Sequence, residues 1–161
     1  MHKINWKFDN TYSKLSETFR EFVKPTPVHN PEIVIFNHQL AQELNLDFSK
    51  ISNVELSKIF SGNSLPQESK TLAQAYAGHQ FGHFTMLGDG RAVLLGEHLD
   101  SKKNRYDIQY KGSGRTSFSR GGDGRAALGP MLREYLISEA IHALNIPTTR
   151  SLAVVKTGEK V

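Results

Sequence analysis

The stretch from Lys111 to Gly129 contains six glycines and too few apolar residues to pack into a core. Regular structure is predicted on both sides of it. Arg105–Tyr110 alternates as a strand does, and apolar side chains recur at helical spacing after Pro130. The chain must therefore carry a long, polar, glycine-rich loop between a strand and a helix. Ordered loops of this length in compact domains are usually functional.

The segments around this loop have clear boundaries. Arg91–Leu99 and Arg105–Tyr110 predict two strands, and residues 100–104 between them have the length of a hairpin loop. Pro130 suits the first turn of a helix that Asn145 and Pro147 end. Residues 151–156 predict a further strand, and residues 71–77 a short helix. The apolar residues of the long helix are Leu132, Leu136, Ala140 and Leu144.

The N-terminal third predicts short elements separated by irregular chain. Val34–Phe36 is expected to form a strand that leads through Asn37, a capping residue type, into a short helix. Ser52 and Glu55 form the capping-box pattern of a second helix, which Gly62 ends. Residues 10–22 fit a helix and a strand almost equally well. Backbone donors are missing at Pro25, Pro27 and Pro31.

The predicted order is a glycine turn at Gly88–Gly90, two strands, Lys111 at the end of the second strand, the glycine-rich loop, and a helix that bears Glu134. This is the order of the small lobe of a protein kinase, in which a glycine loop covers the nucleotide phosphates. A strand lysine contacts those phosphates, and a helix glutamate orients the lysine. The sequence therefore predicts an α+β, protein-kinase-like fold with antiparallel strands, in which an N-terminal extension over 1–70 precedes a small lobe over 71–161.

These features also have ordinary structural explanations. Gly88-Asp89-Gly90 can form a plain turn. Glu134 is expected in the first turn of its helix, where the macrodipole by itself favours a carboxylate. His79 and His83 are four residues apart, but no third ligand accompanies them, so we expect no metal site within the chain. The Gly112-Ser113-Gly114 run resembles half of a dinucleotide fingerprint without the helix that should follow.

Positive charge is concentrated around the same loop. The whole chain carries 20 Lys and Arg against 16 Asp and Glu, a mild bias that indicates no nucleic-acid partner by itself. Basic side chains beside flexible backbone suit a phosphate-rich ligand, although the same arginines can form a solvated basic face. Between residues 105 and 133 the basic residues are Arg105, Lys111, Arg115, Arg120, Arg125 and Arg133, against Asp107 and Asp123.

Long motifs extend over much of the sequence. They are Ala75–Gly82, Leu87–Ala92, Lys111–Thr116, Ser119–Tyr135 and Ile146–Val154. Together they closely resemble the selenoprotein O family of protein adenylyltransferases, and the resemblance covers nearly the whole chain. It implies a kinase-like fold that binds ATP in a reversed orientation and transfers AMP, rather than phosphate, to Ser, Thr or Tyr hydroxyls of proteins.

Carried over position by position, the resemblance also implies a set of site residues. It makes Glu134 the helix glutamate that orients Lys111, and it places the catalytic base and the ligands of Mg²⁺ or Mn²⁺ beyond Val161. The 161-residue chain is therefore expected to hold no catalytic base and no metal ligand, and to be inactive by itself. Nucleotide binding is assigned to Gly88, Gly90, Arg91, Lys111, Asp123 and Gly124.

Two other functions stay open alongside this one. A kinase-like phosphotransferase could use the same lobe, and a non-catalytic module could bind anions or RNA through the basic stretch. The resemblance favours ATP and protein substrates as partners, with no nucleic acid and no membrane. It leaves open whether UMP is transferred as well.

The composition excludes several classes of protein. Without a single cysteine, the chain can form no disulfide, thiolate nucleophile, iron–sulfur cluster or cysteine zinc site. Its longest apolar runs are far shorter than a membrane span. Charged residues interrupt the first twenty positions, so we expect no secretory signal and a cytoplasmic location. Residues 157–160 predict a turn without its returning strand, as expected of a fragment.

Overall fold

The computed structural model describes residues 4–80 and 82–161. Contacts divide the chain into two compact units, each assembled from separate stretches of sequence. Unit 1 contains Pro27–Ser64 and Ala126–Val161, together with residues 4–5. Unit 2 contains Trp6–Thr26 and Leu65–Arg125.

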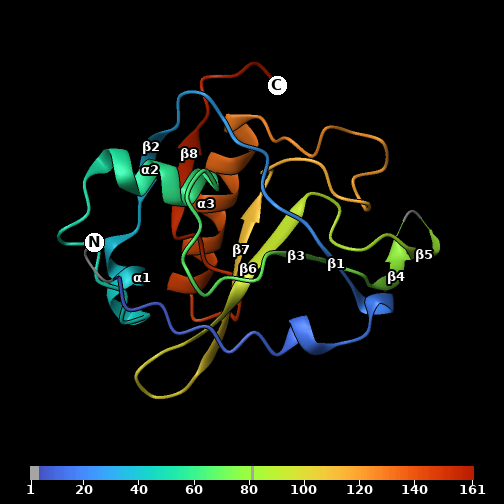
Figure 1. Cartoon of the computed structure of the whole chain (residues 1–161), viewed down its shortest axis with the longest axis horizontal. Helices are drawn as coiled ribbons and strands as arrows, with labels where there is room; N and C mark the ends of the chain where they lie inside the picture. Colours follow the sequence, from blue (N-terminus) through green and yellow to red (C-terminus); the bar gives the residue numbers. More distant parts are fainter. Residues whose placement is uncertain (1–3, 81) are drawn as a thin grey trace. The chain divides into compact units, whose positions relative to one another are not determined.

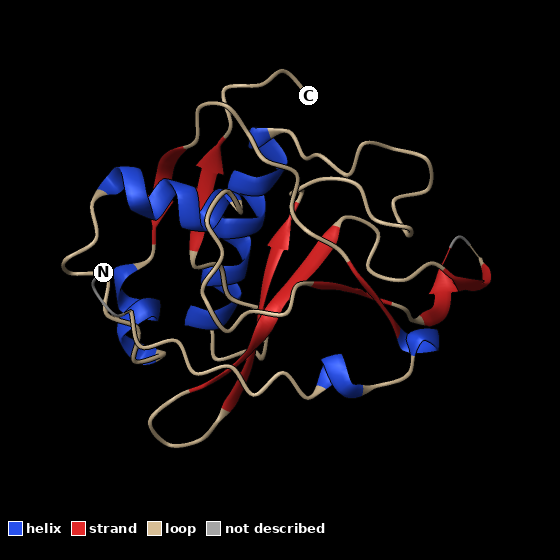
Figure 2. Cartoon of the chain, viewed as in Figure 1, coloured by secondary structure: helices blue, strands red, loops and turns tan. Residues whose placement is uncertain are grey.

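Unit 2 is built on a four-stranded antiparallel sheet (Figure 2). Its last two strands form the predicted hairpin, with Ala92 opposite Lys111 and Leu99 opposite Arg105. Asp100 closes the hairpin loop, because its Oδ1 accepts the backbone N–H of Asn104 at 2.8 Å. The strands, in sheet order, are β1 (Arg20–Phe22), β3 (Leu72–Gln74), β6 (Ala92–Leu99) and β7 (Arg105–Lys111).

The core of unit 2 lies around β6 and corrects one prediction. Val93, Leu94 and Leu95 of β6 are each 1% exposed. The short helix expected over residues 71–77 is wrong, because Leu72 and Ala73 belong to β3 and are buried between β1 and β6. Strand pairing and burial of these side chains outweigh the local helix propensity.

The ambiguous residues 10–22 form two single-turn 3₁₀ helices, η1 (Tyr12–Lys14) and η2 (Glu17–Phe19), followed by β1. Buried Glu97 fixes the start of this segment, because its carboxylate accepts the Tyr12 N–H at 2.7 Å and the Arg105 guanidinium at 2.9 Å. Burial raises the pKa of Glu97, but the hydrogen bonds outweigh it, so the pKa lies below the ordinary value.

A second, two-stranded sheet in unit 2 projects as a small hairpin, β4 (Ala77–Gln80) and β5 (His83–Met86) (Figure 1). His79 lies opposite Phe84 in this pairing. The hairpin leads directly into the Gly88 turn. Phe81, within the motif run Ala75–Gly82, lies outside the described residues.

Unit 1 confirms the two predicted helix starts. Asn37 caps its helix by accepting the Leu40 N–H at 3.0 Å. Ser52 and Glu55 form the predicted capping box, and the helix ends at Gly62 in the left-handed conformation. The elements are β2 (Glu32–Phe36) paired with β8 (Ala153–Lys156), and the helices α1 (His38–Glu43), α2 (Asn53–Ser61) and α3 (Leu128–Ala143).

The long helix α3 confirms the prediction after Pro130 and corrects two details. It begins at Leu128, so Gly129 belongs to the helix rather than to the loop. Glu134 consequently lies in the second turn, and the first turn contains no acidic residue. The helix macrodipole acts on the first turn, so it does not account for Glu134. The mixed fold of helices and antiparallel strands is confirmed.

An ion-pair network in unit 1 joins α3 to the segment before β8. The Arg150 guanidinium binds both carboxylate oxygens of Glu139 at 2.7 Å and reaches Glu43 of α1 at 3.2 Å. The Asn37 side-chain amide also donates to Glu139 at 2.9 Å. The capping residue of α1 is thereby tied to α3.

Candidate functional site

The glycine turn between β5 and β6 is fixed at its base. Gly88 N–H donates to the Tyr76 carbonyl at 3.1 Å, and Asp89 N–H donates to the Gln74 carbonyl at 2.9 Å. The Asp89 carboxylate accepts the Gln74 N–H in return at 3.2 Å. Burial raises the pKa of Asp89, which the Gln74 hydrogen bond lowers and nearby Asp107 raises further. Positive φ angles at Gly88 and Gly90 confirm the predicted turn.

The glycine-rich loop is closed at its own base. Residues 112–127 contain no helix or strand, but Ser113 and Arg125 form an isolated antiparallel bridge. Gly114 N–H donates to the Gly124 carbonyl at 3.3 Å. A side chain at Gly124 would bring its Cβ within 1.8 Å of the Gly114 oxygen, so only glycine allows this crossing of the backbone.

The closed loop folds onto the glycine turn. Thr116 Oγ1 donates to the Gly90 carbonyl at 2.5 Å, and Arg91 Nη1 donates to the Arg125 carbonyl at 3.1 Å. The Phe118 ring packs so closely on Gly88 that a Cβ there would lie 2.4 Å from Cγ. Two separate stretches of sequence therefore meet within unit 2. The predicted site residues brought together are Gly88, Gly90, Arg91, Asp123 and Gly124.

Lys111 lies at the edge of this assembly. It is the last residue of β7, opposite Ala92, and it is exposed. The next backbone N–H, that of Gly112, donates to the Arg91 carbonyl at 3.0 Å. The hairpin pairing thus places the predicted strand lysine beside Arg91.

The Asp123 carboxylate serves the loop itself. Its Oδ1 accepts the Arg125 N–H at 2.9 Å, two residues along the chain, in the manner of an Asx turn. The side chain is exposed, so its other oxygen can accept a further donor.

The arginines around the loop bind backbone carbonyl groups. Arg115 donates through Nε to the Gly122 carbonyl at 3.1 Å and through Nη2 to the Gly121 carbonyl at 3.3 Å. Arg125 reaches the Thr26 carbonyl at 3.4 Å. These backbone carbonyls orient the two side chains. A guanidinium has five N–H donors, so Arg115, which uses Nε and Nη2 in these bonds, has other donors for an anion.

Several residues of this site escaped the sequence interpretation. Thr116 and Phe118 link the loop to the turn, and Thr26 contacts the loop from the far N-terminal stretch, where its N–H donates to the Ser113 carbonyl at 2.8 Å. The glycines at 88, 114 and 124 were the available signal, because each allows one of these close approaches.

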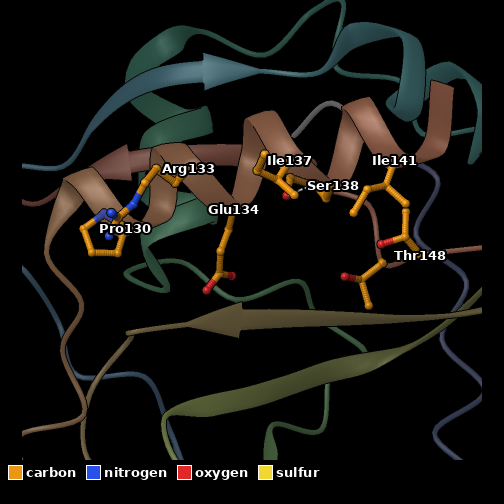
Figure 3. Close-up of a pocket in the computed structure, with 9 residues that line it drawn as sticks. Pro130, Arg133, Glu134, Ile137, Ser138, Ile141 and Thr148 are labelled. Atoms are coloured by element: carbon orange, nitrogen blue, oxygen red, sulfur yellow. Dashed lines mark hydrogen bonds between the residues drawn. The ribbon is translucent and has the colours of Figure 1, made fainter. Parts of the chain in front are cut away.

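Glu134 lines a pocket of about 470 Å³ within unit 1, on one side of α3 (Figure 3). The side chains of Ser138 and Ile141 lie further along the same side of the helix, and Thr148 completes that end of the pocket. Lys111 belongs to unit 2, so the pairing of Glu134 with Lys111 stays a prediction.

The histidines of the hairpin do not form a recognisable ligand set. The His79 ring meets the Phe84 ring edge-on, with centroids 5.8 Å apart. Among residues 4–80 and 82–161, no group of three His, Cys, Asp or Glu side chains is arranged to hold a metal ion. Within the same residues, no helix combines the length and the apolar character needed to cross a membrane.

Comparison with known proteins gives a consistent result. The family model described as protein adenylyltransferase SelO matches residues 2–161. Proteins named protein nucleotidyltransferase YdiU are 70% identical in Pelagibacter ubique, 63% in Anoxybacillus flavithermus and 63% in Nitrosococcus oceani. Each match covers 98% of this chain and 32–33% of the relative. The chain thus spans about a third of the length of these relatives.

Proposed function

The chain belongs to the SelO family of protein adenylyltransferases, and on this premise we propose that it is the nucleotide-binding part of an enzyme that transfers AMP from ATP to Ser, Thr or Tyr hydroxyls of proteins. The observation that carries the proposal is the folding of loop 112–125 onto the Gly88–Gly90 turn. It gathers cations and close-packed glycines from two sequence stretches in one place. We propose that residues 71–161 are the kinase-like lobe that presents this site, and 1–70 an N-terminal extension.

The residues of the assembly fit a nucleoside triphosphate. Arg91 uses one guanidinium donor to hold the Arg125 carbonyl and has others for phosphate oxygens. Lys111 adds a flexible point charge at the exposed strand end. Gly124, where a side chain would clash with the Gly114 carbonyl, lets the loop close beside the bound nucleotide. In this proposal Gly88, Gly90 and Asp123 complete the binding set.

ATP supplies the adenylyl group and a pyrophosphate leaving group. Arg91 and Lys111 hold the terminal phosphates and stabilise the negative charge that develops on the leaving group. This leaves the α-phosphate facing the acceptor hydroxyl. Glu134 orients Lys111 by pairing with its ammonium group. The loop closes over the nucleotide and excludes water.

The catalytic base and the ligands of Mg²⁺ or Mn²⁺ are proposed to come from polypeptide that these 161 residues do not include. The described residues contain no set of three acidic or histidine side chains fit for a divalent cation. The chain covers only 33% of its Pelagibacter ubique relative, which leaves room for such a set elsewhere. The isolated chain is accordingly proposed to bind nucleotide without transferring it.

A double-mutant cycle in the complete polypeptide tests the proposed site. Lys111→Ala and Glu134→Ala should each reduce ATP-dependent transfer to an acceptor protein, by about 10²-fold as for other preorganised charge-stabilising groups. The double variant should be little worse than either, because the glutamate has nothing to orient once the lysine is gone.

Melting temperatures measured on the same variants separate catalysis from folding. A folded Lys111→Ala protein with nearly unchanged transfer would remove the lysine from the mechanism. Strictly multiplicative losses in the double variant would show that the two residues act independently.

A further inference from the structure

Ser113 carries a buried hydroxyl that the structure leaves without a partner. The residue is 8% exposed, and its Oγ makes no hydrogen bond. Burying an unpaired hydroxyl is unfavourable, and such groups are rare in native proteins. Alanine would fill the same space without this cost. The serine hydroxyl therefore needs a hydrogen-bond partner that the protein itself does not provide.

The main chain of Ser113, by contrast, is held through its carbonyl and its bridge. Its carbonyl accepts the Thr26 N–H at 2.8 Å, and the residue forms the bridge with Arg125 that closes the loop. Two other hydroxyls of the same loop, those of Thr116 and Ser119, are paired. Ser119 Oγ donates to the Thr116 carbonyl at 2.8 Å, and Thr116 Oγ1 donates to Gly90. The orphaned hydroxyl is thus a property of Ser113 and not of the loop in general.

The charges near Ser113 indicate which kind of acceptor is missing. Lys111 precedes it by two residues, Arg125 is its bridge partner, and the Arg91 guanidinium donates to the Arg125 carbonyl at 3.1 Å. The nearby carboxylate of Asp123 already accepts the Arg125 N–H. A hydroxyl that needs an acceptor, on a backbone that also carries or pairs with these basic residues, fits a ligand with several anionic oxygens.

We propose that Ser113 is a further nucleotide-binding residue, whose Oγ–H donates to a phosphate oxygen of the bound triphosphate. This inference rests on the proposed function. Gly112 and Gly114 flank Ser113, both with positive φ, at 79° and 128°. A change of the Ser113 χ1 rotamer can turn the hydroxyl from its buried position toward the phosphates when the nucleotide binds, and it leaves the main-chain bonds of Ser113 intact.

The test compares Ser113→Ala with Ser119→Ala in the complete polypeptide. The probe is the non-transferable analogue α,β-methylene ATP with Mg²⁺, and the readouts are the melting temperature without nucleotide and the Kd from calorimetry. Ser113→Ala should melt at the same or a higher temperature and bind about 5- to 10-fold more weakly. Ser119→Ala should melt lower, because it loses a made hydrogen bond, with its Kd little changed.

Two results would overturn the proposal. A lower melting temperature for Ser113→Ala would mean that the hydroxyl is already satisfied in the folded protein, as by a buried water. If the unchanged protein binds the analogue and Ser113→Ala binds it with the same Kd, the hydroxyl does not contact the nucleotide. Failure of the unchanged protein to bind the analogue is a different result, which overturns the proposed function as well.

Discussion

The Thr116 hydroxyl donates to the Gly90 carbonyl across 2.5 Å, and so joins the glycine-rich loop to the glycine turn 26 positions away in sequence. The same Oγ1 accepts the Phe118 N–H at 3.2 Å. One side chain therefore fixes both the position of the loop on the turn and the conformation of the loop itself. Thr116 is buried, so both bonds are shielded from water.

Thr116→Val should loosen this connection. Valine keeps the shape of threonine but leaves the Gly90 carbonyl and the Phe118 N–H without their partner, at a cost of about 1–3 kcal/mol in the free energy of unfolding. Urea denaturation measures this loss. Thr85→Val is the matched control, because the Thr85 hydroxyl bonds the Gly78 carbonyl at 3.3 Å on the β4–β5 hairpin and should contribute less. Equal losses in both variants would contradict a special role for Thr116.

Gly88→Ala should destabilise the protein more than Gly78→Ala. Alanine at Gly88 must adopt a φ of 59° and bring its Cβ to 2.4 Å from Phe118 Cγ, which together should cost about 2–4 kcal/mol. Gly78 has open space around it and no positive φ, so alanine there should be neutral or slightly stabilising.

Adding Phe118→Ala separates the two causes of the Gly88 effect. Removal of the ring should relieve the clash and leave the strain of the positive φ. If Gly88→Ala costs as much free energy of unfolding in the Phe118→Ala background as in the unchanged protein, the ring does not pack on the turn as described.

The local elements that sequence could predict are those with a local cause. The cap at Asn37, the Ser52–Glu55 box and the hairpin after Arg91 each depend on residues a few positions apart. The strand at Leu72–Gln74 was misread as helix, because its conformation depends on β1 and β6, which are distant in sequence. The sequence of residues 71–77 shows their helix propensity but not the strand pairing that outweighs it.

The candidate site shows the same limit. Its glycines and basic residues could be identified by composition, but not the residues that hold them together. Thr26 meets the loop from 87 positions before Ser113, whose carbonyl accepts its N–H. Glu134 was placed one turn too early, because nothing in the sequence before Pro130 marks Leu128 as the helix start; Ala127 makes no side-chain cap.

Unit 1 should lose stability in acid through Glu139. The hydrogen bond from Arg150 lowers the pKa of Glu139 most, and bonds from Ser151 and Asn37 add to it against burial. A carboxyl with a lowered pKa in the folded state stabilises the fold above its unfolded pKa, and this contribution disappears as the pH falls through the folded value. The unchanged chain should therefore lose more stability than Glu139→Gln between about pH 5 and about pH 2.

At neutral pH, Glu139→Gln should already be less stable by about 1.5–3 kcal/mol, because the pair is only 15% and 22% exposed. Glu32→Gln is the control. Its pair with Lys156 is about half exposed, so the change should stay within about 1 kcal/mol. Parallel acid dependence of the unchanged chain and Glu139→Gln would remove Glu139 as the source.

The site formed by the glycine-rich loop and the glycine turn is proposed to serve the transfer of AMP. The complete polypeptide is incubated with a divalent cation, an acceptor protein and ATP that carries different isotopes in its α- and γ-phosphates, and both isotopes are counted on the acceptor. We predict that the α-label alone is incorporated and that Lys111→Ala reduces its incorporation by about 10²-fold. Incorporation of the γ-label without the α-label would show a phosphoryl-transferring kinase and overturn the proposed transfer of AMP.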